Sequence, residues 1–116
     1  MTPSELLIWG LVIHLGVDLL LQNEWMALNK VSLKHPAAYV HSGLHFCGLV
    51  WIFPWWIALG VATTHLLIDT RVPLRWWREF YGQTRDPNNP MSIHVAFWGD
   101  QTLHIVVIAV ASLLVR

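Results

Sequence analysis

Four apolar stretches of this chain each carry two ionisable side chains spaced four residues apart. This spacing places both members of a pair on the same face of an α-helix, one turn apart. The pairs consist only of histidine and aspartate: His14 and Asp18, His41 and His45, His65 and Asp69, and Asp100 and His104. A fold built from these stretches must turn eight such side chains toward one another or toward some other polar surroundings.

The apolar stretches predict an all-α protein, a four-helix transmembrane bundle that forms a single domain, 1–116. The chain is 55% hydrophobic and only 12% charged, whereas a soluble domain of this size needs a larger charged surface to cover its core. Pro54 interrupts the apolar run 36–69, so a hairpin of two helices is preferred over one long helix. We expect helices at about 4–21, 36–53, 55–69 and 92–115.

A polar stretch, 71–90, separates the third and fourth predicted helices. Its first half alternates arginine with aromatic residues and predicts an amphipathic segment lying at the membrane interface. Its second half, 86–90, is rich in proline and asparagine and predicts a loop. We expect Arg71, Arg75 and Arg78 to attract anionic lipid headgroups.

The basic residues predict the orientation in the membrane. Six of the seven lie in the two loops before the second and fourth helices, namely Lys30, Lys34, Arg71, Arg75, Arg78 and Arg85. The positive-inside rule places these loops in the cytoplasm and both termini on the outer side, most simply in a bacterial inner membrane. A formal net charge of zero argues against a nucleic-acid partner, which usually requires a basic stripe.

This topology brings the four pairs to one depth, in the cytoplasmic half of the membrane. Each ionisable group there costs about 2.5–3.5 kcal/mol, so the eight are expected to compensate one another inside the bundle. Imidazoles and carboxylates are good ligands for a divalent transition metal, so all eight are candidate ligands. Zinc is favoured, as one or two ions, with iron or manganese as alternatives.

The charge of the cluster suits two metals. Two divalent cations would be balanced by three carboxylates and a bridging hydroxide. Gln22 and Gln101 are expected to orient ligands from behind, although hydrogen bonds between helices explain both equally well. The alternative for the whole cluster is a metal-free network of His–Asp hydrogen bonds. The two remaining histidines, His35 and His94, are expected to lie at the membrane edges. Cys47, the only cysteine, offers this chain neither a disulfide nor a cysteine-based zinc site.

The chain resembles the bacterial and phage membrane proteins of the domain of unknown function 3307 family over nearly its whole length. The ordered residues that carry the resemblance are His14-x-x-x-Asp18, Leu21-Gln22, Lys30, Tyr39 with His41, His65-x-x-Ile68-Asp69 and Asp100-Gln101-x-x-His104. Arg71 stands where the family favours lysine, so the charge is kept. The pattern is also distantly similar to the membrane-bound metal-dependent hydrolases, and this likeness implies a metal site more strongly than it implies a reaction.

These features together predict a membrane metalloenzyme, most simply a zinc hydrolase acting on a lipid or lipid-linked substrate at the cytoplasmic interface. One of the three aspartates would act as the base if the metal does not occupy it fully. The main alternative is a small accessory subunit of a larger membrane complex, with a structural metal or none. A metal or proton carrier is disfavoured because the polar groups cluster at one depth and do not line a path.

Overall fold

The computed structural model describes residues 1–82 and 89–115, and every regular element in them is a helix. The long helices are α1, Pro3–Gly16; α3, Pro36–Leu49; α4, Trp55–Asp69; and α6, Pro90–Leu114. Three shorter elements connect them: the π-helix η1, Val17–Leu21; α2, Glu24–Asn29; and α5, Val72–Tyr81. The prediction of an all-α chain is therefore confirmed. Most of the predicted loop 86–90, together with Arg85 and Arg116, lies outside the described residues.

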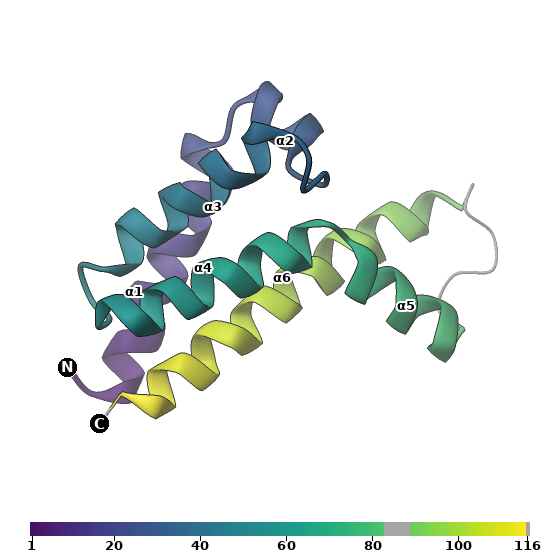
Figure 1. The fold of residues 1–116 in the computed structure, drawn as a ribbon. Helices are drawn as coiled ribbons and strands as arrows, with labels where there is room; N and C mark the ends of the chain where they lie inside the picture. Colours follow the sequence, from purple (N-terminus) through teal and green to yellow (C-terminus); the bar gives the residue numbers. More distant parts are fainter. Residues whose placement is uncertain (83–88, 116) are drawn as a thin grey trace.

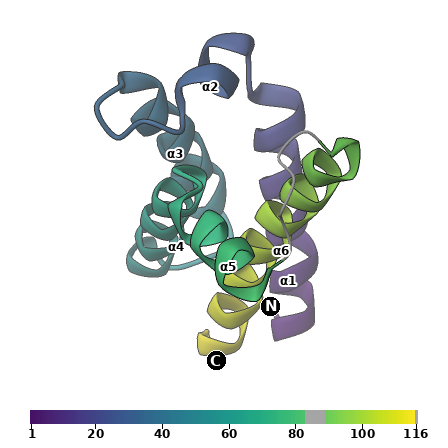
Figure 2. The ribbon, with the colours of Figure 1, turned by 90° about the vertical axis from the view of Figure 1, so that its right-hand side faces the viewer.

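The four long helices form a closed ring in which each packs against two others (Figure 1). Helix α1 packs on α3 and α6, and α4 packs on the same two helices. The two termini lie side by side at one end of the molecule, while α2 and α5 lie away from them (Figure 1). Figure 2 shows the bundle from the side that carries α5, with α1 and α6 on one side and α3 and α4 on the other. The molecule measures 44 × 29 × 21 Å.

Helix α3 ends at Leu49, earlier than the predicted Phe53. Pro54 stops the helix from continuing further, because it disfavours helical backbone at Phe53 and cannot donate a hydrogen bond to the preceding turn. The chain closes instead with tight turns, in which Trp51 N donates to Gly48 O and Phe53 N donates to Leu49 O. Helix α4 then begins directly after Pro54.

Helix α2 lies between the first two predicted helices, where the sequence predicted only a loop. The Asn23 side chain caps it by accepting a hydrogen bond from Met26 N, the usual role of asparagine at a helix start. Met26 is buried, and α2 packs against α3. The short helix therefore has a fixed place beside the bundle.

The apolar core fills the end of the bundle near the termini. Its largest fully buried members are Leu6, Leu49 and Ile108, which come from α1, α3 and α6. Glycine allows these helices to approach closely: a Cβ atom on Gly10 would lie 2.6 Å from Ile108 Cγ2, and one on Gly48 would lie 2.6 Å from Ile13 Cγ2. The packing at this end leaves no room for a methyl group at either position.

Two helical stretches are long and apolar enough to cross a membrane, judged by length and composition. They are Pro3–Leu21, which joins α1 and η1, and Pro90–Leu114. Helices α3 and α4 have 14 and 15 residues, which is below the 18 residues of that criterion. Two of the four predicted spans therefore meet it on their own.

We predict that Gly10→Ala destabilises the protein by about 1–3 kcal/mol, the usual range for overpacking a core. The buried, β-branched Ile108 cannot move away from the added methyl group. Thermal unfolding of the purified protein in mild detergent, followed by circular dichroism, measures the effect. Gly60→Ala is the matched control, because a Cβ atom added at Gly60 would meet nothing within 4 Å. Equal melting temperatures for the two variants would contradict the tight contact.

Candidate metal centre

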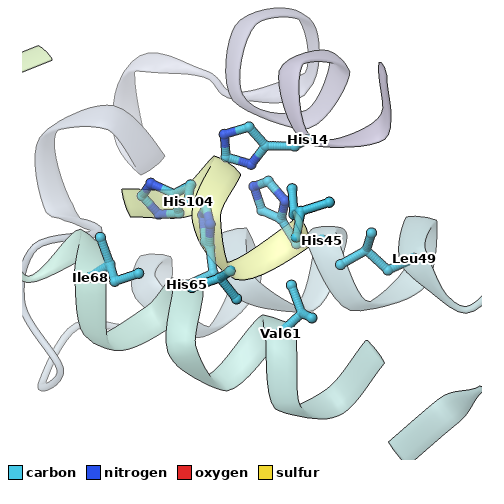
Figure 3. A pocket seen from close by; sticks show the side chains of 9 residues that line it. His14, His45, Leu49, Val61, His65, Ile68 and His104 are labelled. Carbon is cyan, nitrogen blue, oxygen red and sulfur yellow. The ribbon is translucent and has the colours of Figure 1, made fainter. Parts of the chain in front are cut away.

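Seven of the eight predicted ligand side chains meet in the middle of the bundle and are buried. They are His14 from α1, Asp18 from η1, His41 and His45 from α3, His65 and Asp69 from α4, and His104 from α6. Figure 3 shows the imidazoles of four of them pointing toward one another from four different helices. The rings are close: the centroids of His45 and His65 are 3.7 Å apart, and those of His65 and His104 are 4.1 Å apart.

Asp18 is the centre of the first half of the cluster. It lies in the π-helix η1, and such single wide turns often occur at functional sites. Its Oδ1 atom lies 3.0 Å from Nε2 of both His41 and His45. The wide turn therefore delivers one carboxylate oxygen to two imidazoles of the neighbouring helix α3.

Asp69 is the centre of the second half. Its Oδ2 atom lies 2.9 Å from His65 Nε2 and 3.3 Å from His41 Nε2. Its Oδ1 atom lies 3.4 Å from His104 Nε2. The two halves are joined through His41, whose Nε2 atom contacts both aspartates, and through His65, whose Nε2 atom is also 3.8 Å from Asp18 Oδ1.

Several of these close contacts are not aligned as hydrogen bonds. The buried atoms without a hydrogen-bond partner in the described part of the chain include Nε2 of His41, His65 and His104 and Oδ1 of Asp69. Buried polar atoms normally have a partner. Ligand atoms around a tetrahedral zinc ion, with bonds of about 2.0–2.1 Å, stand about 3.3 Å apart. Ring nitrogens and carboxylate oxygens that lie this close together, but do not point at one another as hydrogen-bond partners do, have the arrangement expected of ligands directed at a shared ion.

Two overlapping groups of side chains could hold a metal ion. One consists of Asp18, His41, His45 and His65, and the other of His65, Asp69 and His104. Within each group the ligand atoms lie within 4.8 Å of one another. The sequence predicted all six of these residues as candidate ligands.

His14, also a predicted ligand, lies outside both groups, and its Nε2 atom is hydrogen-bonded to a glutamine. Gln101 Nε2 donates to Asp18 Oδ2 over 3.2 Å, since an ionised carboxylate only accepts. Gln101 Oε1 therefore faces His14 and accepts from His14 Nε2 over 2.9 Å. With a proton on Nε2, His14 supports Asp18 from behind, as does Gln101.

Asp100, the eighth predicted ligand, also lies behind the cluster. His104 Nδ1 is 2.8 Å from the Asp100 carbonyl oxygen and 3.6 Å from the carboxylate. A carbonyl can only accept, so the proton of His104 is on Nδ1 and its Nε2 lone pair faces the cluster. Gln22, the other predicted supporting residue, has a buried Oε1 atom without a hydrogen-bond partner among the described residues.

Lys30 belongs to the cluster, although from the sequence we placed it only in a cytoplasmic loop and in the family pattern. Its Nζ atom lies 3.8 Å from Asp69 Oδ1, and its side chain is 12% exposed. The residue directly follows α2, which the sequence did not predict. Nothing in the spacing of Lys30 along the chain would have revealed this contact.

A cavity of about 10 Å³ borders the cluster. Four imidazoles line it, together with apolar side chains of the core: His14, His45, His65, His104, Leu49, Val61, Ile68, Val107 and Ile108. Figure 3 shows the labelled members of this lining. A volume of this size holds about one water molecule.

The three predicted headgroup arginines line a larger groove, at the end of the molecule away from the termini. The groove has a volume of about 640 Å³ and is lined by Val31, Thr70, Arg71, Leu74, Arg75, Arg78, Glu79 and Ala96. Arg78 is fixed there by hydrogen bonds from its Nη2 atom to Ser92 O and Oγ. Arg71 has a left-handed backbone, with φ of 66°, an uncommon conformation for any residue with a side chain.

These features define the chain as a helical protein with a buried histidine–aspartate cluster that could hold a metal ion. It belongs to the family described as protein of unknown function (DUF3307), whose model matches residues 6–116. No curated protein and no solved structure matches the chain. The likeness to membrane-bound metal-dependent hydrolases stays a prediction.

We predict that Gln101→Leu lowers the free energy of unfolding by about 1–3 kcal/mol. The substitution leaves His14 Nε2 and Asp18 Oδ2 buried without the amide that joins them, and each lost partner carries a desolvation penalty of this order. Chemical unfolding in detergent, followed by circular dichroism, measures the change. Thr102→Ala, on the exposed side of α6, is the control. A Gln101→Leu protein as stable as the control would show that the network is not structural.

Proposed function

We propose that this protein is an integral membrane metal-dependent hydrolase, with zinc as the first candidate ion, that acts on a lipid or lipid-linked substrate at the cytoplasmic interface. The observation that carries the proposal is the cluster itself. Buried ring nitrogens of His41, His65 and His104 face two carboxylates at ligand spacing, and within the described residues they form no aligned hydrogen bonds. A metal-free network would use those atoms in hydrogen bonds to one another.

The distribution of polarity supports the placement in a membrane. The bundle is polar at its centre, whereas its outer surface carries large apolar side chains such as Trp9 and Val12 on α1 and Val106 and Val110 on α6. Leu20 of η1 is 83% exposed. A soluble protein rarely exposes continuous apolar surface of this extent, but a surface in contact with lipid is expected to be apolar.

We place four helices across the membrane, two of them short. At 1.5 Å per residue, α3 and α4 are about 21–23 Å long, so the hydrocarbon layer of about 30 Å must thin locally around their hairpin. The exposed Trp51, Trp55 and Trp56 at the hairpin tip suit the outer interface. The basic α5 and the loop with Lys34 lie at the other end and suit the cytoplasmic face.

The cluster offers the parts that hydrolysis needs. A divalent metal lowers the pKa of a bound water to near neutrality and polarises a carbonyl or phosphoryl oxygen. The cavity beside the imidazoles has room for one water molecule, and Asp69 Oδ1, within the cluster, accepts no hydrogen bond from any described residue. A closed structural site would need neither feature.

The groove supports a substrate with an anionic headgroup. Three arginines and one glutamate among its lining residues give it a net positive charge, while Leu74, Val31 and Ala96 supply apolar wall. Lys30 lies between the groove and the His–Asp cluster, since its side chain contacts Asp69 in the cluster and the next residue, Val31, lines the groove. A headgroup bound in the groove would therefore lie near the cluster, with its chains in the membrane.

Metal analysis of the protein purified in detergent tests the metal centre. We expect bound divalent metal in the wild type and at least a tenfold loss in His65→Ala, because His65 belongs to both ligand groups. His94→Ala, which removes an exposed histidine of α6, should keep the metal. Inductively coupled plasma mass spectrometry measures metal per chain. A wild-type protein that stays metal-free after loading with zinc, iron or manganese would sink the proposal.

The groove makes a separate prediction about lipid affinity. Each arginine near anionic lipid contributes about 1 kcal/mol, so the double variant Arg71→Gln/Arg75→Gln should bind a short-chain anionic phospholipid roughly tenfold or more weakly. Binding is measured by thermophoresis in neutral detergent. Lys34→Gln also removes one positive charge, but from an exposed loop residue that does not line the groove. This variant should bind the lipid as the wild type does. Equal affinity of the wild type for a zwitterionic short-chain lipid would contradict charge recognition.

A further inference from the structure

The Lys30 ammonium lies beside the second of the two ligand groups, next to its carboxylate. Its side chain is only 12% exposed, and Nζ lies 3.8 Å from Asp69 Oδ1. Lysine is almost never buried without a charged partner. The position is fixed by α2, since Lys30 N donates to Met26 O and Met26 is buried.

The two ligand groups differ in this respect. The Asp18 group has four members and no cation within it, whereas the Asp69 group has three members and Lys30 beside its carboxylate. The groups also share His65, whose Nε2 atom lies 3.8 Å from Asp18 Oδ1 and 2.9 Å from Asp69 Oδ2. A divalent ion in the Asp69 group would stand next to the ammonium and repel it.

The positive and negative charges of the cluster balance when it holds one divalent ion. Asp18 and Asp69 are the two carboxylates of the cluster, because Asp100 lies behind His104 and outside both groups. Two carboxylates and one hydroxide carry three negative charges, and one divalent ion with Lys30 carries three positive charges. A second divalent ion would leave an excess of positive charge in a buried site, which is costly.

We infer that the cluster holds one divalent metal ion, on Asp18, His41, His45 and His65, and that Lys30 takes the place of a second metal beside Asp69. This inference rests on the proposed metal centre and goes further by assigning the two halves different roles. The first half binds the ion. The second half keeps a carboxylate free of metal.

The free carboxylate has a chemical use. Lys30 Nζ lies 3.8 Å from Asp69 Oδ1 and fixes this carboxylate at the edge of the ion site. A carboxylate in such a position is a candidate general base for the hydrolysis proposed above. Lys30 is therefore a positioning residue for Asp69.

The number of ions per chain tests this division. Protein stripped with chelator, reloaded with excess zinc and desalted should contain one zinc per chain in the wild type. Lys30→Met should rise from one toward two, while Lys30→Arg and the loop control Lys34→Met should stay at one. Two ions in the wild type, or one in Lys30→Met, would overturn the inference and leave the metal centre standing. No zinc in the wild type would refute both.

A second pair of variants separates the halves without changing Lys30. Asp69→Asn should retain one zinc per chain, because Asp69 is not a ligand, whereas Asp18→Asn should lose at least nine-tenths of it. Circular dichroism in detergent verifies that both variants are folded. Loss of zinc from a folded Asp69→Asn protein, or its retention by Asp18→Asn, would place the ion in the other half and contradict the assignment.

Discussion

The structure depends on the burial of two carboxylates, Asp18 and Asp69, at the centre of a helical ring. An ionised carboxylate moved out of water costs several kcal/mol unless partners surround it. Here imidazoles from all four long helices, the Gln101 amide and the Lys30 ammonium lie around the two groups. Each long helix of the ring therefore contributes polar contacts to the buried carboxylates, in addition to its apolar packing.

The apolar half of the core fixes the positions of the helices that carry the polar half. Near the termini, the close approach at Gly10 and Gly48 leaves little freedom for α1, α3 and α6 to shift against one another. The same helices then carry His14, His45 and His104 into the cluster. A tightly packed base of this kind fixes the positions of these three side chains relative to one another.

Much of the cluster could be predicted from sequence because helical spacing is a local property. Pairs at four-residue separation, combined with alternating helix direction, were sufficient to bring His41, His65 and Asp69 to one level. The roles of His14 and Asp100 could not be read in this way, since they depend on which ring nitrogen carries a proton. That choice is made by Gln101 and by the Asp100 carbonyl oxygen, which pattern and periodicity do not distinguish.

The fold was predictable to a similar degree. Hydropathy predicts the four apolar helices. It does not predict three details: the early end of α3, the π-turn at Asp18 and the position of Lys30. Pro54 stops α3 from continuing further. For the π-turn we find no local signal in the sequence. Lys30 reaches the cluster only because Asn23 and Met26 fix a short helix beside α3.

Arg71 shows that this chain accepts local strain for the sake of charge. At the junction of α4 and α5 the backbone turns with φ of 66°, a geometry that glycine adopts freely and that costs other residues about 1–2 kcal/mol. A glycine here would make a more stable elbow. An arginine at this position accepts that cost and adds a guanidinium to the lining of the groove, so that local stability is lower than a glycine would give.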